Sequence, residues 1–234
     1  MILLSGKKQT PLRGENTMKL LISNKGFTFT EILVAMIISS MVMGGICSTF
    51  YSQQNSYVTQ DQRCMMQQNL RSAMYFMERE IRMAGFDPTG GAGAGIQPVS
   101  QSSIQITRDL NNNGNTTDAD EDIIYVLYDA DGDLDNDLGR EDVNGGAGNE
   151  LLAENIDALN FVYLDEDGIS TTNPSEIRSV QISIVARADR PDRGYQNTKV
   201  YQNQVGGTVF PATGDNYRRK MLSTEVMCRN LGLE

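Results

Sequence analysis

The hydrophobic pattern divides the chain into an apolar N-terminal run, an amphipathic segment and a region of short alternating runs. Between Phe27 and Phe50 the sequence FTFTEILVAMIISSMVMGGICSTF is almost continuously apolar, with Glu31 as its only charged residue. A helix of this length is long enough to cross a bilayer. The pattern therefore predicts a membrane-spanning helix over residues 27–50.

An amphipathic pattern follows once the composition turns polar after Ser52. Apolar residues recur at helical spacing and form a stripe about 80° wide, made of Met66, Leu70, Ala73, Met74, Met77, Ile81 and Ala84. Charged residues lie off this stripe, namely Arg71, Glu78, Arg79 and Arg82. The spacing predicts that this half of the helix packs one face on a core.

Only Gly44-Gly45 interrupts the two helical patterns, so we expect one helix from about Phe27 to Ala84. It should end at Gly85-Phe86-Asp87-Pro88, because glycine suits a helix C-cap and proline cannot continue the helix. A flexible loop, TGGAGAGIQP, follows.

Alternating and β-branched runs beyond this loop predict strands. They cover residues 103–108, 122–128, 156–164, 177–187 and 218–229. Residues 165–168 read as a turn, and residues 190–217 as a long surface loop. We therefore predict an α+β fold, in which a long N-terminal helix with a protruding apolar half and a docked amphipathic half packs on an antiparallel β-sheet head.

Composition excludes several classes of function. There is no histidine, which removes the commonest general base and transition-metal ligand. Residues 1–26 carry five of the 20 basic residues and one of the 30 acidic ones, which leaves 15 and 29 beyond, a net charge of −14. Such a surface repels nucleic acid phosphates, so we predict no nucleic acid binding. Because the commonest general base is missing, we also predict no enzyme activity.

The charged N-terminus reads as a leader that precedes the apolar run. In a secretory signal the cleavage site follows the apolar region, whereas here the junction at Gly26-Phe27 comes before it, so cleavage would leave the helix attached. An uncleaved signal anchor is the alternative, and translation starts at either Met1 or Met18. The predicted divisions are residues 1–26 as leader, 27–50 as membrane helix, 51–85 as docked helix and 86–234 as head.

The hexapeptide Gly26-Phe27-Thr28-Phe29-Thr30-Glu31 resembles the processing site of type IV pilins and of the pseudopilins of type II secretion. The resemblance implies that a prepilin peptidase cuts after Gly26 and N-methylates Phe27. A carboxylate in a membrane helix costs about 2.5–3.5 kcal/mol and needs a partner. Cleavage creates one, the Phe27 amine, and pairing between Glu31 and the amine of an adjacent subunit would set subunit register.

Two acidic stretches predict structural Ca²⁺ sites. The first fits a twelve-residue EF-hand-like pattern with glycine at position six, and its predicted ligands are Asp109, Asn111, Asn113, Asn115 and Asp120. The second is framed from Asp131, with Asn136 in place of the glycine, and its predicted ligands are Asp131, Asp133, Asp135, Asp137 and Asp142. Solvated acidic turns are the alternative. Asp120 departs from the pattern's terminal glutamate, so weaker coordination is expected.

Three cysteines show no metal or redox spacing. Cys64 and Cys228 either form a disulfide in an oxidising compartment or remain apart. The helical wheel places Cys64 about 120° from the docked stripe, whereas Cys228 is in phase with inward-facing residues, which argues against the bond.

The layout over residues 26–231 resembles PilW-type minor pilins, through NLRSAMYFMEREIRMAGFDP, LNFVYLDEDG, IRSVQISIVARADR and YRRKMLSTEVMCRNLGL. This implies a subunit that primes assembly, with the prepilin peptidase, other minor pilins, the major pilin and the inner-membrane assembly platform as partners. It also implies a single-pass inner-membrane protein with an extracytoplasmic head that later joins the pilus. The alternatives are a J-like minor pseudopilin of type II secretion and a membrane-anchored calcium-binding adhesin that never polymerises.

Overall fold

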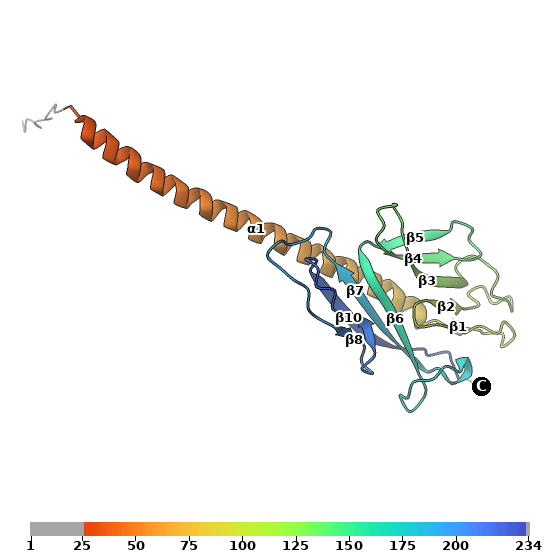
Figure 1. Ribbon diagram of the computed structural model, residues 1–234. Helices are drawn as coiled ribbons and strands as arrows, with labels where there is room; N and C mark the ends of the chain where they lie inside the picture. Colours follow the sequence, from red (N-terminus) through yellow and green to blue (C-terminus); the bar gives the residue numbers. More distant parts are fainter. Residues whose placement is uncertain (1–25, 233–234) are drawn as a thin grey trace, which may run out of the picture. The chain divides into compact units, whose positions relative to one another are not determined.

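A computed structural model describes residues 26–232, except for the side chains of Pro98 and Val99. The predicted leader, apart from Gly26, lies outside the described residues. The chain divides into two compact units after Ser52. A single helix, α1 (Phe29–Ile81), runs from the first unit into the second (Figure 1).

The second half of α1 buries the stripe that the sequence predicts. All seven of its apolar residues, from Met66 to Ala84, are at most 5% exposed. Arg71, Arg79 and Arg82 are exposed on the other faces of the helix. The prediction of a docked amphipathic segment is therefore confirmed.

The helix ends one turn earlier than expected, at Ile81, and a tight turn leads to Gly85. Gly85 has φ +78°, and a Cβ placed on it would lie 2.4 Å from a methyl carbon of Leu231. Glycine is needed here both for the left-handed conformation and for the close approach of Leu231. Its amide then donates to the carbonyl of Thr107 at 3.0 Å, which ties the helix end to the first sheet.

The head contains two main antiparallel sheets where the sequence pattern predicts one. The first has the order β1-β2-β3-β4-β5. Its strands are β1 (Ile96–Val99), β2 (Ile104–Thr107), β3 (Asp122–Tyr128), β4 (Asp137–Asp142) and β5 (Asn149–Ala153). All four pairs are antiparallel, and register shifts occur between β1 and β2 and between β4 and β5.

The second sheet has the order β10-β7-β6 and comes from the C-terminal half of the chain (Figure 1). Its strands are β6 (Ile156–Leu164), β7 (Ser179–Arg187) and β10 (Arg219–Met227). A short 3₁₀ helix, η1 (Pro174–Glu176), precedes β7. The segment predicted as a long loop contains a small hairpin, made of β8 (Tyr201–Gln202) and β9 (Thr208–Phe210).

The core lies between the docked stripe of α1 and the inner faces of the two sheets. Fully buried side chains include Ile104, Tyr125, Phe161 and Ile184, so both sheets contribute to one apolar cluster. The fold is thus α+β, with one long N-terminal helix packed on antiparallel sheets, as the sequence predicts.

Candidate functional site

The start of α1 is a capping box. Glu31 accepts hydrogen bonds from the backbone amide and the hydroxyl of Thr28, both at 2.8 Å. In return, the Glu31 amide donates to the Thr28 hydroxyl at 3.3 Å. This reciprocal arrangement satisfies amides that otherwise lack a partner at a helix N-terminus. Glu31 therefore has a local structural role in addition to any role in assembly.

The residues around the predicted cleavage point are open to solvent. Phe27 is 84% exposed and Gly26 is also exposed. Among the described residues, none between Gly26 and Val58 is buried. The best 18-residue window of α1 has a mean hydropathy of 2.0, which is apolar enough for a membrane span. The helix continues through Gly44-Gly45 without a break.

The first acidic loop folds around Asp109, which is fully buried. Its carboxylate accepts the Asn112 amide at 2.6 Å and the Gly114 amide at 2.9 Å. Gly114 has φ +80°, so it supplies the left-handed residue that the pattern requires at position six. Asn111 and Asn113 both turn their side chains toward the carboxylate of Asp118, at 2.9 and 2.7 Å.

The loop is closed by Glu121 and not by Asp120. Glu121 is 1% exposed, and its carboxylate accepts the amides of Leu110, Asn111 and Asp118. Asp120 instead pairs with Arg140 at 2.6 Å. Glu121 stands one residue beyond the twelve-residue frame, so the sequence pattern passed over it. Asn115, another predicted ligand, accepts the amide and hydroxyl of Thr117.

The second acidic loop begins two residues earlier than the predicted frame. One carboxylate oxygen from each of Asp129, Asp131 and Asp133 lies within 4.8 Å of the others. The amide of Leu134 donates to Asp129 at 3.2 Å, and Leu134 has φ +71°. Leu134 thus takes the place that Gly114 holds in the first loop. The two loops share this geometry at opposite ends of β3.

The remaining predicted ligands of the second loop do not join this cluster. Asp135 pairs with Arg187. Asp137 is buried and accepts the amides of Ala130 and Asn155, at 3.1 and 2.9 Å. Asp142 is the last residue of β4 and accepts the Asp120 amide at 2.8 Å. The frame from Asp131 to Asp142 is therefore corrected, because its second half is a strand.

A buried ion cluster fastens α1 to the first sheet. Glu80 accepts Arg140 through both carboxylate oxygens, at 3.0 and 3.2 Å, and Arg108 at 3.2 Å. The hydroxyl of Tyr125 also donates to Glu80. Burial raises the pKa of Glu80, but the bonds from Arg140 and Tyr125 and the charge of Arg108 outweigh it and hold the pKa below its usual value. The sequence pattern missed this cluster.

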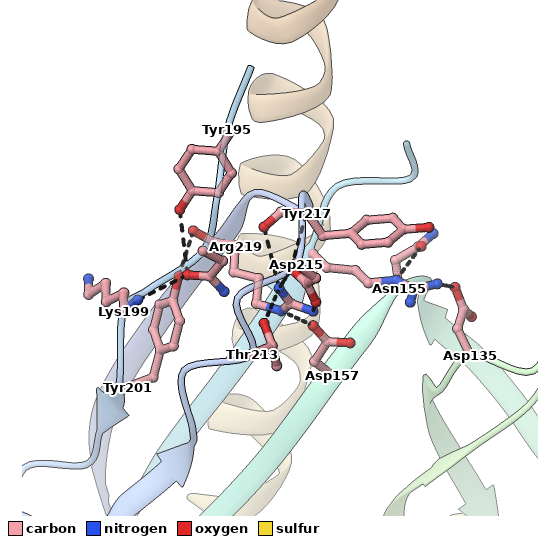
Figure 2. A network of polar contacts seen from close by, with 12 residues as sticks. Asp135, Asn155, Asp157, Tyr195, Lys199, Tyr201, Thr213, Asp215, Tyr217 and Arg219 are labelled. Atoms are coloured by element: carbon pink, nitrogen blue, oxygen red, sulfur yellow. Dashed lines mark hydrogen bonds and ion pairs between the residues drawn. The ribbon is translucent and has the colours of Figure 1, made fainter. Parts of the chain in front are cut away.

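A second cluster centres on Arg219 at the start of β10, and Figure 2 shows it between the long loop and the β6 strand. Arg219 binds both oxygens of Asp215, at 2.6 and 2.7 Å, and pairs with Asp157 on β6. Its guanidinium lies 4.9 Å from the centre of the Phe210 ring. The cluster ties the loop of residues 190–217 to the second sheet.

Asp215 makes part of this attachment sensitive to acid. The hydrogen bonds from Arg219 lower the pKa of Asp215 to about 2. A carboxylate whose folded pKa is depressed adds stability that is fully present above its unfolded pKa, about 3.9. This stability is lost as the pH falls through 2. We expect Asp215→Asn to remove the part of the pH dependence of the free energy of unfolding that Asp215 contributes between pH 4 and 2.

The measurement is the free energy of unfolding at pH steps between 2 and 5. Asp167→Asn is the control, because Asp167 lies in the turn after β6 and does not contact Arg219. An unchanged acid profile in Asp215→Asn would show that Arg219 does not hold this carboxylate.

The cysteines are not bonded to each other. Cys64 is exposed on α1, whereas Cys228 is 4% exposed and packs in the core. Burial raises the pKa of the Cys228 thiol to about 12. The alternative in which the two thiols remain apart is the one present in this structure.

Two family models match separate parts of the chain. Residues 22–46 match the model of the prokaryotic N-terminal methylation motif, and residues 151–230 match that of type IV pilus-assembly protein W. No curated protein matches the chain. A type IV-like pilin from Thermus thermophilus is similar in structure, with 15% identity and a TM-score of 0.45, over 70% of this chain and 96% of that one.

The two family matches agree with the geometry of the chain. The methylation motif covers the capping box and the exposed apolar helix that follows it. The match to assembly protein W covers the whole of the second sheet, because it runs from within β5 to just beyond the end of β10. The chain is therefore similar to type IV pilus proteins in two separate parts, its N-terminal methylation motif and its C-terminal sheet.

Proposed function

We propose that this chain is a minor pilin, a subunit that initiates or primes the assembly of a type IV pilus. The observation that carries the proposal is the start of α1, where Gly26-Phe27 precedes an exposed apolar helix with Glu31 as its one charged residue. The match of residues 151–230 to pilus-assembly protein W supports an assembly role over that of a bulk subunit.

In this proposal a prepilin peptidase removes the leader after Gly26 and methylates the new amine of Phe27. The chain is then a single-pass inner-membrane protein with its head outside the cytoplasm. From there it enters the filament through the inner-membrane assembly platform, together with other minor pilins and the major pilin. The apolar half of α1 leaves the lipid only if other helices cover it, because none of the described residues between 26 and 58 is buried in the monomer.

In this proposal Glu31 makes the transfer of the helix from the membrane into the filament specific for one arrangement of subunits. A carboxylate in an apolar helix bundle is costly unless it has an opposite charge beside it. The Phe27 amine of an adjacent subunit supplies that charge, and pairing fixes the axial register of two helices. The hydroxyl and amide of Thr28 already hold the Glu31 carboxylate in place at the helix start.

Deletion of this chain in its own cells tests the proposal. We expect surface pili and twitching to be lost, while protein export by type II secretion continues. The opposite result, lost export with normal pili, would assign the chain to the J-like pseudopilins. Normal pili and normal export would leave the non-polymerising adhesin as the function.

Calcium binding stays a prediction, and the donor set fits it. Asp129, Asp131 and Asp133 offer only oxygen atoms, the ligand type that Ca²⁺ prefers, and their side chains are exposed. In the first loop Asp109, Asn111 and Asn113 hold the same relative positions. An ion bound in each loop would neutralise its carboxylates and hold the two loops at the ends of β3 in place.

We expect removal of calcium by EGTA to lower the melting temperature of the mature protein in detergent. A ligand at a hundred times its Kd adds about 2.7 kcal/mol, or roughly 5–11 °C for a head of this size. Asp129→Ala should abolish part of that shift, whereas Asp167→Ala, in the turn after β6, should not. Equal melting curves with and without calcium would mean that the loops are solvated turns.

A further inference from the structure

Among residues 26–232, no strand pairs with the outer edge of β10. The Cys228 amide donates to the carbonyl of Arg178 at 2.9 Å, and the Ala188 amide donates to the carbonyl of Arg218 at 2.8 Å. The backbone amides and carbonyls of the even-numbered residues of β10 therefore face β7. Backbone groups of an antiparallel strand alternate between its two sides. The free edge therefore presents the amides and carbonyls of Met221, Ser223, Glu225 and Met227.

This edge is regular enough to accept another strand. Nine consecutive residue pairs join β10 to β7 without a bulge, and Met227 is 70% exposed. The Tyr201 hydroxyl reaches only the first carbonyl, that of Arg219, at 3.2 Å. Long, flat and unpaired edges are templates for strand addition, and proteins usually blunt them when they are not used.

The chemistry beside the edge favours an acidic strand. A groove of about 550 Å³ lies at its C-terminal end, lined by Met227, Cys228, Leu231, Glu225 and the three arginines Arg82, Arg178 and Arg229. The carboxylate of Glu225 accepts the Ser179 hydroxyl. Lys220 is exposed near the other end of the edge. Positive charge therefore exceeds negative charge along this side of an otherwise acidic head.

The same chain carries a strand of the matching kind. β5 is the last strand of the first sheet, and its outer edge pairs with no other strand among the described residues (Figure 1). The Val143 amide donates to the carbonyl of Asp122, so the backbone groups of odd-numbered β4 residues face β3. Those of Arg140 therefore face β5, where its paired residue is Glu150. By the same alternation, the backbone groups of Asn149 and Leu151 face outward. Leu151 is 45% exposed, and Glu150 is exposed beside it.

Nearly all the net charge of the head lies around β5. Residues 109–154 contain 14 acidic residues and Arg140 as the only basic one, a net charge of −13 out of the −14 beyond residue 26. The rest of the chain after the leader is close to neutral. The head therefore has a strongly acidic part with one open edge and a separate open edge lined by arginines.

We propose that β5 of one head adds to the free edge of β10 of a second copy of this chain. Main-chain hydrogen bonds join the two edges, and Glu150 and Glu154 lie at the arginine-lined end of β10, beside Arg82 and Arg229. The two surfaces differ, so the contact is head-to-tail and leaves a free β10 and a free β5 at the two ends of any chain of copies.

Site-specific photo-crosslinking in cells tests this contact in the full chain. The photoreactive residue p-benzoylphenylalanine replaces Leu151, and in the control it replaces Ile169, which is 63% exposed in the turn after β6. We expect a covalent dimer of this chain only from position 151, with the linked peptide inside residues 219–227. Equal crosslinking from position 169, linkage to another segment, or capture of a different protein would overturn the proposal.

Charge reversal provides an independent test. The variant Glu150→Lys/Glu154→Lys should cut the dimer yield by about tenfold, as should Arg82→Glu/Arg229→Glu, whose two arginines line the groove at the end of β10. The four changes together should restore it. Thermal unfolding checks that each variant folds. No loss in either pair, or no recovery in the combined variant with all three folded, would show that these edges do not meet.

Discussion

We expect Glu31→Gln to remove the chain from assembled filaments as completely as Glu31→Ala does. Without the carboxylate, the Phe27 amine of the adjacent subunit is buried among apolar helices with no opposite charge. Such an unpaired charge costs about 2.5–3.5 kcal/mol, so incorporation should fall by about two orders of magnitude. The measurement is the ratio of this chain to the major pilin in sheared filaments, determined by quantitative mass spectrometry.

The glutamine variant separates the two roles of Glu31. Glutamine still completes the capping box with Thr28, since its side-chain oxygen accepts the same two hydrogen bonds. Alanine loses both the cap and the charge. If filaments contain normal amounts of Glu31→Gln but little Glu31→Ala, the residue acts only as a helix cap and the proposed pairing is wrong.

We expect Glu80→Leu to destabilise the head strongly. It leaves Arg108 and Arg140 without their common partner, and both guanidinium groups are largely buried, with side chains 8% and 12% exposed. Removing one partner of a buried ion pair costs about 3–5 kcal/mol, which is roughly 6–20 °C in melting temperature for a head of this size. Thermal unfolding of the mature protein in detergent measures it.

Glu78→Leu is the matched control on the same helix. Glu78 is partly exposed, and among the described residues it forms no ion pair, so its loss should change stability by about 0.5 kcal/mol at most. Equal melting temperatures for Glu78→Leu and Glu80→Leu would show that the buried cluster adds nothing to the attachment of α1.

Elements that depend on local periodicity were predictable from the sequence. The docked stripe of α1 repeats every three or four residues, and each of its members is buried. β3 and β6 begin and end at the predicted residues, because each is a run rich in apolar and aromatic residues that is bounded by turns.

The sequence could not reveal β4, because its reason for being a strand is tertiary. Its sequence, DLGRED, reads as part of an acidic loop. Arg140 in its middle is stabilised by Glu80, which lies 60 residues earlier on the helix. Nothing in the sequence of β4 itself indicates that Arg140 pairs with a carboxylate on α1, so the strand could not be predicted from its own residues.

The candidate site was predictable where it follows a short motif and less so elsewhere. Gly26, Phe27 and Glu31 are recognisable from their order alone, and the Thr28-x-x-Glu31 spacing is also that of a capping box. The predicted frame of the second acidic loop starts at Asp131, two residues after the loop begins at Asp129. The reason is that Leu134 holds the left-handed position at which the pattern expects glycine.

The proposed function depends most on the removal of the leader and on the burial of the new N-terminus in a polymer. Mass spectrometry of sheared, purified surface filaments tests both together. We expect a peptide from this chain that begins with N-methylated Phe27. A filament fraction without this chain, together with a cellular form that still carries residues before Phe27, would contradict the proposal.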